Sequence, residues 1–293
     1  MKLKSWWITA RPNTLAVSIA PVLLGISLAF HDNQLNNIFV AFLTLIAAIM
    51  IQIGTNFIND YYDFINGADD KNRLGPIRSA QSGLLSLNEI KYGGSISFLI
   101  ALMIGVYLVI EGGLPILIIG SLSLISGYCY TGGPYPLGYK GLGDIFVFLF
   151  FGLLAVPGTY YLQTNILFDF NSILIGSSIG CIAVAILCVN NIRDVNTDKK
   201  VGKKTLAVRC GAFPIIILFD TMIILSYLFI IILFWNWNSS SYALYLQILS
   251  IPVSIKLIID IHNKNGRALN DVLKNTCYFY EIFSLLLILG IIL

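Results

Sequence analysis

The chain has 293 residues, of which 57% are hydrophobic and only 11% are charged, with a net charge of +3. Its mean hydropathy of +0.83 places it among integral membrane proteins and excludes an ordinary soluble domain. A net charge this small gives no reason to expect a nucleic-acid partner.

Nine apolar stretches reach or approach the roughly 20 residues that a helix needs to cross a bilayer. They predict an all-α integral membrane protein of about nine transmembrane helices, forming a single domain over residues 1–293. The cores of these stretches lie at about 14–30, 38–58, 94–110, 114–130, 143–163, 172–192, 213–234, 241–261 and 277–293.

The positive charges alternate along the chain. The 18 Lys and Arg residues lie before the first stretch, in every second connection or, for Lys256, in the eighth stretch near such a connection, and the connections at 31–37, 111–113, 164–171 and 235–241 contain none. The positive-inside rule therefore predicts a cytoplasmic N-terminus and cytoplasmic basic loops in the cell's inner (plasma) membrane. That basic side would contact anionic membrane lipid, and it could also hold an anionic substrate.

The second apolar stretch ends in a polar segment, residues 56–83. Asn56 and Asp60 form one i, i+4 pair at its start, and Asn59 and Asp63 form another. Residues four apart share one face of a helix. Carboxylates on one stripe repel each other unless a cation lies between them, so this helix end is a candidate cation site.

The sixth apolar stretch ends in a similar segment, residues 190–209, where Asn190, Asp194 and Asp198 are spaced i, i+4, i+8. We expect the two segments to present their oxygens to a shared cavity, with Asp63, Asp194 and Asp198 as the catalytic carboxylates. Oxygen-rich clusters with amide neighbours suit Mg²⁺, which usually bridges to substrate phosphates. The predicted metal ligands are Asn59, Asp60, Asp63, Asn190, Asp194 and Asp198.

Basic residues near both segments could neutralise the oxygens of a diphosphate. The predicted diphosphate-binding residues are Arg73, Arg78, Lys140, Lys203 and Lys204. Together, the cations and the metal would stabilise the charge that develops on a leaving diphosphate, so the chemistry indicated is ionisation of a diphosphate ester.

The stretches NDYYD and RDVNTD resemble the two aspartate-rich motifs of the UbiA superfamily of intramembrane aromatic prenyltransferases. Four longer stretches are similar to the branch that prenylates 1,4-dihydroxy-2-naphthoate: ARPNTL (10–15), GADDKNRLGPIRSAQSGL (67–84), GYCYTGGPYPLGYKGLGD (127–144) and GKKTLAVR (202–209). The resemblance implies nine transmembrane helices around a central cavity. It also implies Mg²⁺-dependent transfer of a polyprenyl group from polyprenyl diphosphate to this aromatic acid, with decarboxylation, giving demethylmenaquinone in menaquinone biosynthesis.

The first motif departs from the family pattern. The superfamily motif is usually N-D-x-x-D-x-x-x-D, and its last Asp falls here on Gly67. Asp69 or Asp70 could replace it from the loop, whereas a solvated helix end is the simpler interpretation of both residues.

Other polar residues allow two interpretations each. The Gly- and Tyr-rich segment 127–144 is either a plain turn or a source of aromatic faces that stabilise an allylic cation. Arg11 is either an interfacial anchor or, as the resemblance favours, a site residue that faces an anionic substrate. The candidate acceptor-binding or cation-stabilising residues are Arg11, Asn56, Tyr128, Tyr130 and Tyr139. Asp220 and Glu281 lie within apolar runs, so we expect them to line the cavity or to pair helices.

Two other functions compete with this interpretation. Transfer to 4-hydroxybenzoate would use the same metal residues and differ only in the acceptor pocket. A cation-coupled transporter would also carry intramembrane carboxylates, but near the bilayer midplane on broken helices. The acidic residues here lie at the predicted cytoplasmic ends among basic residues, which favours a phosphorylated headgroup.

Overall fold

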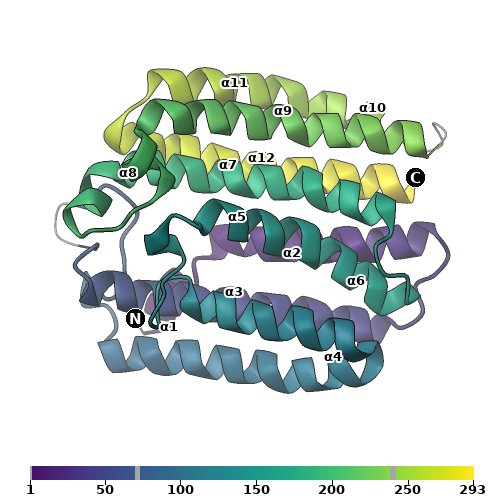
Figure 1. The fold of residues 1–293 in the computed structure, drawn as a ribbon, viewed down its shortest axis with the longest axis horizontal. Helices are drawn as coiled ribbons and strands as arrows, with labels where there is room; N and C mark the ends of the chain where they lie inside the picture. Colours follow the sequence, from purple (N-terminus) through teal and green to yellow (C-terminus); the bar gives the residue numbers. More distant parts are fainter. Residues whose placement is uncertain (1, 70–72, 238–241) are drawn as a thin grey trace.

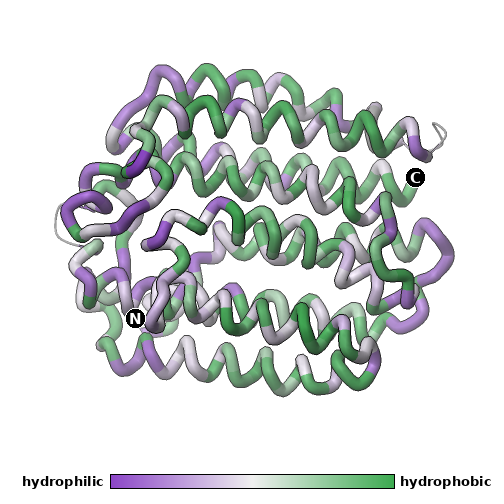
Figure 2. Tube along the Cα trace, in the orientation of Figure 1, coloured by the Kyte–Doolittle hydropathy of each residue, from purple (hydrophilic) through white to green (hydrophobic). Residues whose placement is uncertain are grey.

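The computed structural model describes residues 2–69, 73–237 and 242–293, and in these residues it contains helices and no strand. The long helices lie side by side in one bundle (Figure 1). Apolar residues follow the helices and hydrophilic residues gather at the two ends of the bundle (Figure 2). The prediction of an all-α membrane protein is therefore confirmed.

The α-helices, in chain order, are α1 (Lys2–Ala10), α2 (Pro12–His31), α3 (Ile38–Ile65), α4 (Leu87–Cys129), α5 (Gly143–Val147), α6 (Ala155–Thr164), α7 (Phe170–Lys200), α8 (Leu206–Cys210), α9 (Ala212–Asn236), α10 (Ala243–Gln247), α11 (Ile251–Asn263) and α12 (Leu269–Ile292). Four shorter helical segments join them: the 3-10 turns η1 (Gly138–Lys140), η3 (Ile248–Ser250) and η4 (Gly266–Ala268), and the π-helical η2 (Phe148–Leu154).

Helix α4 is a helical hairpin. A straight helix of its 43 residues would be about 64 Å long, twice the thickness of a bilayer core. The chain reverses at Gly113, where φ is +65°, a value that glycine adopts without strain. As a result a Cβ on Gly127 would lie 3.2 Å from Phe98, whereas a straight helix would separate the two residues by about 43 Å. The reversal falls at the predicted connection 111–113.

In the described residues, eight helices are long and apolar enough to cross a membrane, and α4 is one of them. Counting the two arms of α4 separately gives nine apolar segments in this part of the chain, and the exact number of membrane spans stays a prediction. The orientation of the N-terminus stays a prediction.

Local capping fixes where several spans begin. Pro12 occupies the first turn of α2, where its missing N–H costs nothing. The Asn37 side chain caps α3, and Asp169 caps α7. Ser86 and Glu89 form a reciprocal capping box at the start of α4. The capping box fixes the first residue of α4, so the α3–α4 connection ends at Ser86.

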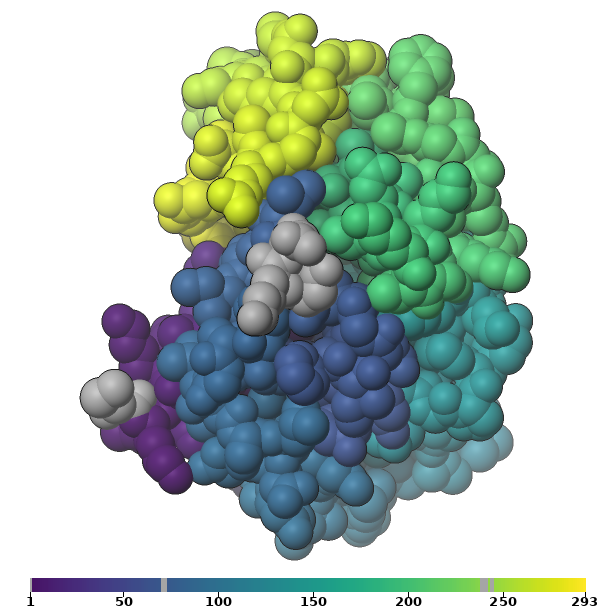
Figure 3. Space-filling model, turned by 90° about the vertical axis from the view of Figure 1, so that its left-hand side faces the viewer, coloured from purple at the N-terminus to yellow at the C-terminus, as the bar shows by residue number. Residues whose placement is uncertain are grey.

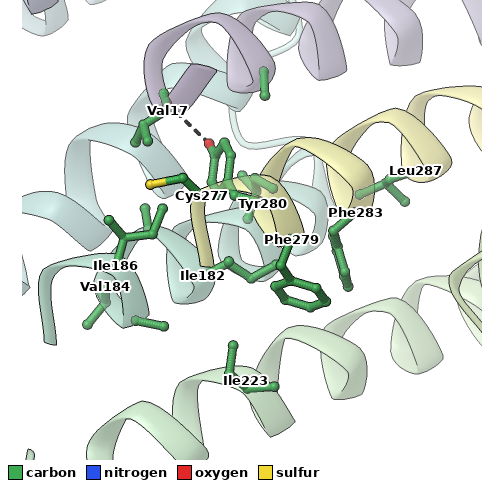
Figure 4. Packing of buried hydrophobic residues seen from close by; sticks show 14 of the residues in the cluster. Val17, Ile182, Val184, Ile186, Ile223, Cys277, Phe279, Tyr280, Phe283 and Leu287 are labelled. Atoms are coloured by element: carbon green, nitrogen blue, oxygen red, sulfur yellow. Dashed lines mark hydrogen bonds between the residues drawn. The ribbon is translucent and has the colours of Figure 1, made fainter. Parts of the chain in front are cut away.

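The core lies around α7, which is buried along most of its apolar length. Phe279 and Tyr280 of α12 pack there with Ile182 of α7, as Figure 4 shows, and the Tyr280 hydroxyl donates a hydrogen bond of 3.1 Å to the Val17 carbonyl of α2. The π-helical η2 approaches α7 so closely that a Cβ on Gly176 would lie 2.5 Å from a backbone oxygen of η2. A glycine is therefore required at this crossing.

At the end of the bundle that carries the N-terminus, three segments distant in sequence meet. Figure 3 shows the α3–α4 connection between the start of α12 and the α7–α8 segment. The Asn270 amide of α12 joins them: its Nδ2 donates to the Leu74 carbonyl (2.8 Å), and its Oδ1 accepts from Arg193 Nη1 of α7 (3.0 Å). This face of the bundle is where the two acidic segments come together.

Candidate active site

A cavity of about 630 Å³ opens at this end of the bundle, and both acidic segments line it. Twelve of the residues singled out in the sequence face it: Arg11, Asn59, Asp63, Asp69, Arg73, Arg78, Tyr130, Asn190, Asp194, Asp198, Lys203 and Glu281.

The α3 wall of the cavity is held in place by the Tyr-rich segment between α4 and α5. The Tyr139 hydroxyl donates to Asp63 Oδ1 (2.9 Å), and the Thr131 hydroxyl donates to Asn59 Oδ1 (2.6 Å). Tyr139 is buried and does not line the cavity. Burial and the nearby Asp63 carboxylate raise the pKa of the Tyr139 hydroxyl, so it remains a hydrogen-bond donor at neutral pH. Its role is therefore to orient a site carboxylate.

The α7 wall carries two carboxylates, each paired with a neighbouring cation. Arg193 donates two hydrogen bonds to Asp194, from Nε (2.8 Å) and from Nη2 (2.6 Å). Lys203 Nζ lies 3.5 Å from Asp198 Oδ1. Burial lowers the pKa of Lys203, but the surrounding carboxylates, led by Asp63 and Asp198, together raise it by more, so the net shift is upward and the ammonium stays charged.

The α3–α4 connection returns a further carboxylate to the cavity. Gly67, with φ +75°, allows the chain to turn, and the N–H groups of Ala68 and Asp69 both donate to the Asp63 carbonyl. Asp69 is buried, pairs with Arg73 and lies 3.3 Å from Arg78 Nε. Burial raises the pKa of Asp69 to about 6, against the lowering effect of Arg73. The loop thus supplies a cavity carboxylate where the family motif has its last Asp. Asp70 lies outside the described residues.

Asn56 and Asp60 lie behind the cavity wall, which differs from their predicted roles as acceptor residue and metal ligand. Asp60 is 1% exposed and accepts hydrogen bonds from the N–H groups of Ser79 (3.0 Å) and Ala80 (3.4 Å). The Asn56 amide donates to the Ala10 carbonyl (2.9 Å). The stripe of these two residues is rotated by about 60° from the stripe that faces the cavity, because a helix turns about 100° per residue.

We expect substitutions of Asp60 to lower the stability of the fold and to have little effect on metal binding. In Asp60→Ala two N–H groups of the α3–α4 connection lose their acceptor, and an unsatisfied buried donor costs about 1–3 kcal/mol. We expect a lower midpoint of thermal unfolding for the purified protein. Asp60→Asn keeps one acceptor oxygen and should lose less. An unchanged midpoint together with a weaker Mg²⁺ dependence would instead support the metal-ligand prediction.

Three other predicted residues do not face the cavity. Lys140 is exposed, with Nζ 5.4 Å from the centre of the Tyr135 ring. The short turn η1 directs Tyr139 inward, so that the next side chain points outward. Lys204 is exposed. Tyr128 is also exposed, so of the three tyrosines proposed for the reacting centre only Tyr130 lines the cavity.

Arg11 lies at the cavity wall between α1 and α2 in a left-handed conformation, with φ 53° and ψ 68°. This conformation costs a non-glycine residue about 1–2 kcal/mol, and such strain concentrates at functional sites. Burial lowers the pKa of Arg11, while the nearby Asp60 raises it. Its Nη2 lies 3.4 Å from the backbone oxygen of Asn56. Its position agrees with a site role.

Several cavity residues were missed in the sequence. Arg193 was counted only as a basic loop residue, and Asp144 stood unnoticed at the end of the Tyr-rich segment. On α12, Lys274 and Tyr278 line the cavity together with Glu281. The 3.6-residue spacing of these three polar residues in an apolar run was the available signal.

The two ionisable residues noted within apolar runs take the two expected roles. Glu281 lines the cavity. Asp220 Oδ2 of α9 lies 2.8 Å from His262 Nε2 of α11, so this contact joins the two helices.

The donor set fits a hard divalent cation. Asn59, Asp63, Asp194 and Asp198 supply amide and carboxylate oxygens, the ligand types that Mg²⁺ prefers. The buried Asp144 Oδ1 at the same cavity has no hydrogen-bond donor in the described part of the chain. Among the described residues, no three or more His, Cys, Asp or Glu side chains form a group that could hold a metal ion. Oxygens of substrate and of water would complete the coordination sphere of a bound Mg²⁺.

A second cavity of about 210 Å³ lies deeper in the bundle and is mostly apolar. It is bounded by α2, α3, both arms of α4, α5, η2 and α6, and Tyr130 lines both cavities. Fold and site thus define a multi-pass membrane protein with a charged cavity at one end and an apolar cavity beneath it.

Comparisons with known proteins agree with this description. Residues 18–279 match the UbiA prenyltransferase family. Similar relatives include the 1,4-dihydroxy-2-naphthoate octaprenyltransferases of Haemophilus influenzae (35% identity, covering 100% of this chain and 97% of the relative) and Escherichia coli (33% identity, 100% and 96%). The chain belongs to the UbiA prenyltransferase family.

Solved structures share the fold. An apo UbiA homologue from Aeropyrum pernix superimposes with a TM-score of 0.71 at 14% identity, covering 96% of this chain and 98% of that one. A UbiA homologue from Archaeoglobus fulgidus, solved bound to DMAPP and Mg²⁺, superimposes with a TM-score of 0.66 at 15% identity, covering 97% and 99%.

Proposed function

We propose that this protein is a Mg²⁺-dependent polyprenyltransferase that joins a polyprenyl group to 1,4-dihydroxy-2-naphthoate, with loss of the ring carboxylate, to give demethylmenaquinone. The observation that carries the proposal is the meeting of the α3 and α7 acidic segments with Arg78 and Lys203 in one cavity at a bundle end. The names of the bacterial relatives support naphthoate over 4-hydroxybenzoate as the acceptor.

The cations Arg73, Arg78 and Lys203 would hold the diphosphate. Negative charge on this group grows as the bond to the allylic carbon breaks, so their interaction strengthens toward the transition state. Bound Mg²⁺ would add electrophilic stabilisation of the same leaving group, with Asn59, Asp63, Asn190, Asp194 and Asp198 as its proposed protein ligands. Asp69 would keep Arg73 and Arg78 oriented toward the cavity.

The apolar cavity beneath the charged one would take the first part of the prenyl tail. Its walls include Val22, Ile119, Phe150 and Leu162. Tyr130 stands where the two cavities meet, which is where the allylic carbon would lie between headgroup and tail. Its aromatic face could stabilise the developing cation there.

We place the cavity on the cytoplasmic face of the inner (plasma) membrane, because all the predicted basic connections lie at this end. A reporter fused after Leu293 should then be exported, whereas one inserted within residues 195–205 should stay cytoplasmic. Cytoplasmic location of both reporters would exclude an odd number of spans between the 195–205 connection and Leu293, and with it the proposed nine-span arrangement.

The function is tested with the purified protein, a polyprenyl diphosphate and either 1,4-dihydroxy-2-naphthoate or 4-hydroxybenzoate. We expect a prenylated naphthalene product together with released CO₂, and loss of both when EDTA removes the divalent cation. Prenylation of 4-hydroxybenzoate alone would support the other acceptor. Cation flux in proteoliposomes without any transfer would support a transporter.

A further inference from the structure

The charges around the large cavity fall into two groups. Four cavity cations lie within ion-pair distance of a carboxylate: Arg73, Arg78, Arg193 and Lys203. Two others, Arg11 and Lys274, form no ion pair with any described residue. An anion that enters the first group must displace a carboxylate that is already paired, whereas Arg11 and Lys274 have no described carboxylate within ion-pair distance, although Asp60 lies near enough to Arg11 to attract it.

Lys274 belongs to a polar stripe on α12. Asp271, Lys274, Tyr278 and Glu281 follow one another at helical spacing, and all four line the cavity. Lys274 Nζ lies 5.5 Å from the centre of the Tyr278 ring. The stripe therefore combines an ammonium group with an aromatic face.

The register of α2 and α12 brings this stripe level with Arg11. Both helices begin at the same end of the bundle, and the hydrogen bond from Tyr280 to Val17 fixes their relative height (Figure 4). Lys274 and Arg11 each lie six residues before a partner of that bond, or about 9 Å nearer the end. Trp7 of α1 lines the same part of the cavity.

We infer that Lys274 and Tyr278 of α12, together with Arg11, form the subsite in this cavity for an aromatic carboxylic acid, the acceptor. The inference rests on the proposed function. A planar aromatic acid can stack its ring on Tyr278 while its carboxylate accepts a charge-assisted hydrogen bond from Lys274.

Glu281 would set the orientation of the acid. It lies seven residues beyond Lys274 on the same stripe, or about 10 Å deeper. Its charge disfavours a carboxylate at that depth, so the acid enters with its carboxylate toward the cavity mouth and its ring toward the reacting centre. Asp271 lies one turn nearer the end and is exposed, so water screens its charge.

The first test compares Lys274→Ala with Lys256→Ala, which removes an exposed lysine of α11 outside the cavity. In the transfer assay Lys274→Ala should raise KM for the acceptor acid by about 10- to 100-fold, the effect of one charge-assisted hydrogen bond, and leave KM for the prenyl diphosphate within about twofold. Lys274→Arg should restore most of the affinity, and Lys256→Ala should resemble the wild type. Equal increases in both KM values, or none, would overturn the inference.

The second test needs no turnover, so it separates this inference from the proposed function. Binding of 2-naphthoate and of uncharged 2-naphthol is measured by calorimetry on the full chain without Mg²⁺ or diphosphate. Lys274→Ala should weaken binding of the acid by about 10-fold or more and leave the alcohol unchanged, whereas Tyr278→Leu should weaken both. Failure of the wild type to bind 2-naphthoate, or equal losses for both ligands in Lys274→Ala, contradicts the subsite even if transfer to naphthoate is observed.

Discussion

Asp63→Asn and Asp194→Asn are each expected to reduce prenyl transfer by at least about a hundredfold at saturating Mg²⁺, since even residues that only support metal ligands are worth about 10- to 100-fold. Each change removes a negative charge from a cavity wall. Asparagine is the informative substitution because it keeps an oxygen for the hydrogen bonds that Tyr139 donates to Asp63 and Arg193 donates to Asp194. Turnover and the midpoint of thermal unfolding are measured on the same preparations.

The alanine variants provide the matched comparison for stability. Asp194→Ala leaves the Arg193 guanidinium, whose side chain is 2% exposed, without its carboxylate. Removing one partner of a buried ion pair costs about 3–5 kcal/mol, so this variant should also unfold at a lower temperature. Asp63→Ala removes the acceptor of the Tyr139 hydroxyl and one carboxylate near Lys203, but Lys203 keeps Asp198 beside it, so this variant should lose less. Near-normal turnover in either alanine variant, which has no side-chain oxygen at that position, would exclude that residue as a ligand.

Lys203→Ala is expected to lower turnover by about 10- to 100-fold, because a charge-assisted hydrogen bond to a leaving group is worth roughly 1.5–3 kcal/mol. Arg78→Ala should act in the same direction. Both side chains line the cavity, whereas Lys140 is exposed beside Tyr135. Lys140→Ala should therefore leave turnover within about twofold, although its sequence context suggested the same role.

The kinetic pattern decides between possible roles of these cations. Removal of a residue that binds the diphosphate lowers turnover. Removal of a residue that binds only the carboxylate of the acceptor raises KM for the acid alone. A larger loss of turnover in Lys140→Ala than in Lys203→Ala would show that the Tyr-rich segment moves over the substrate and would contradict the arrangement described above.

Sequence reasoning predicted the spans well because lipid imposes a length and an apolar composition on every helix that crosses it. The reversal at 111–113 followed from the same constraint, since α4 is too long for one crossing. A charge pattern was enough to pair the connections at 56–83 and 190–209. Their convergence on one cavity is what the described residues show.

The spacing of residues in these segments could not predict which of them face the cavity and which stabilise the fold. Asn56/Asp60 and Asn59/Asp63 are equivalent i, i+4 pairs in the sequence, and only the packing of α1 and the α3–α4 connection turns one pair away from the cavity. Lys140 presented a similar ambiguity, because one residue in a short turn decides whether a side chain points inward. Arg193 was missed since its two partners, Asp194 and Asn270, are respectively adjacent and 77 residues away.

The backbone at Arg11 has a consequence for anyone who wishes to make this protein more robust. With φ at 53°, position 11 is a place where glycine would relieve strain, and a thermostability screen would select that replacement. The selected protein would keep its fold and gain heat resistance while losing a guanidinium from the cavity wall. Screens on this chain should therefore score catalysis alongside melting temperature, because at this residue the two objectives oppose each other.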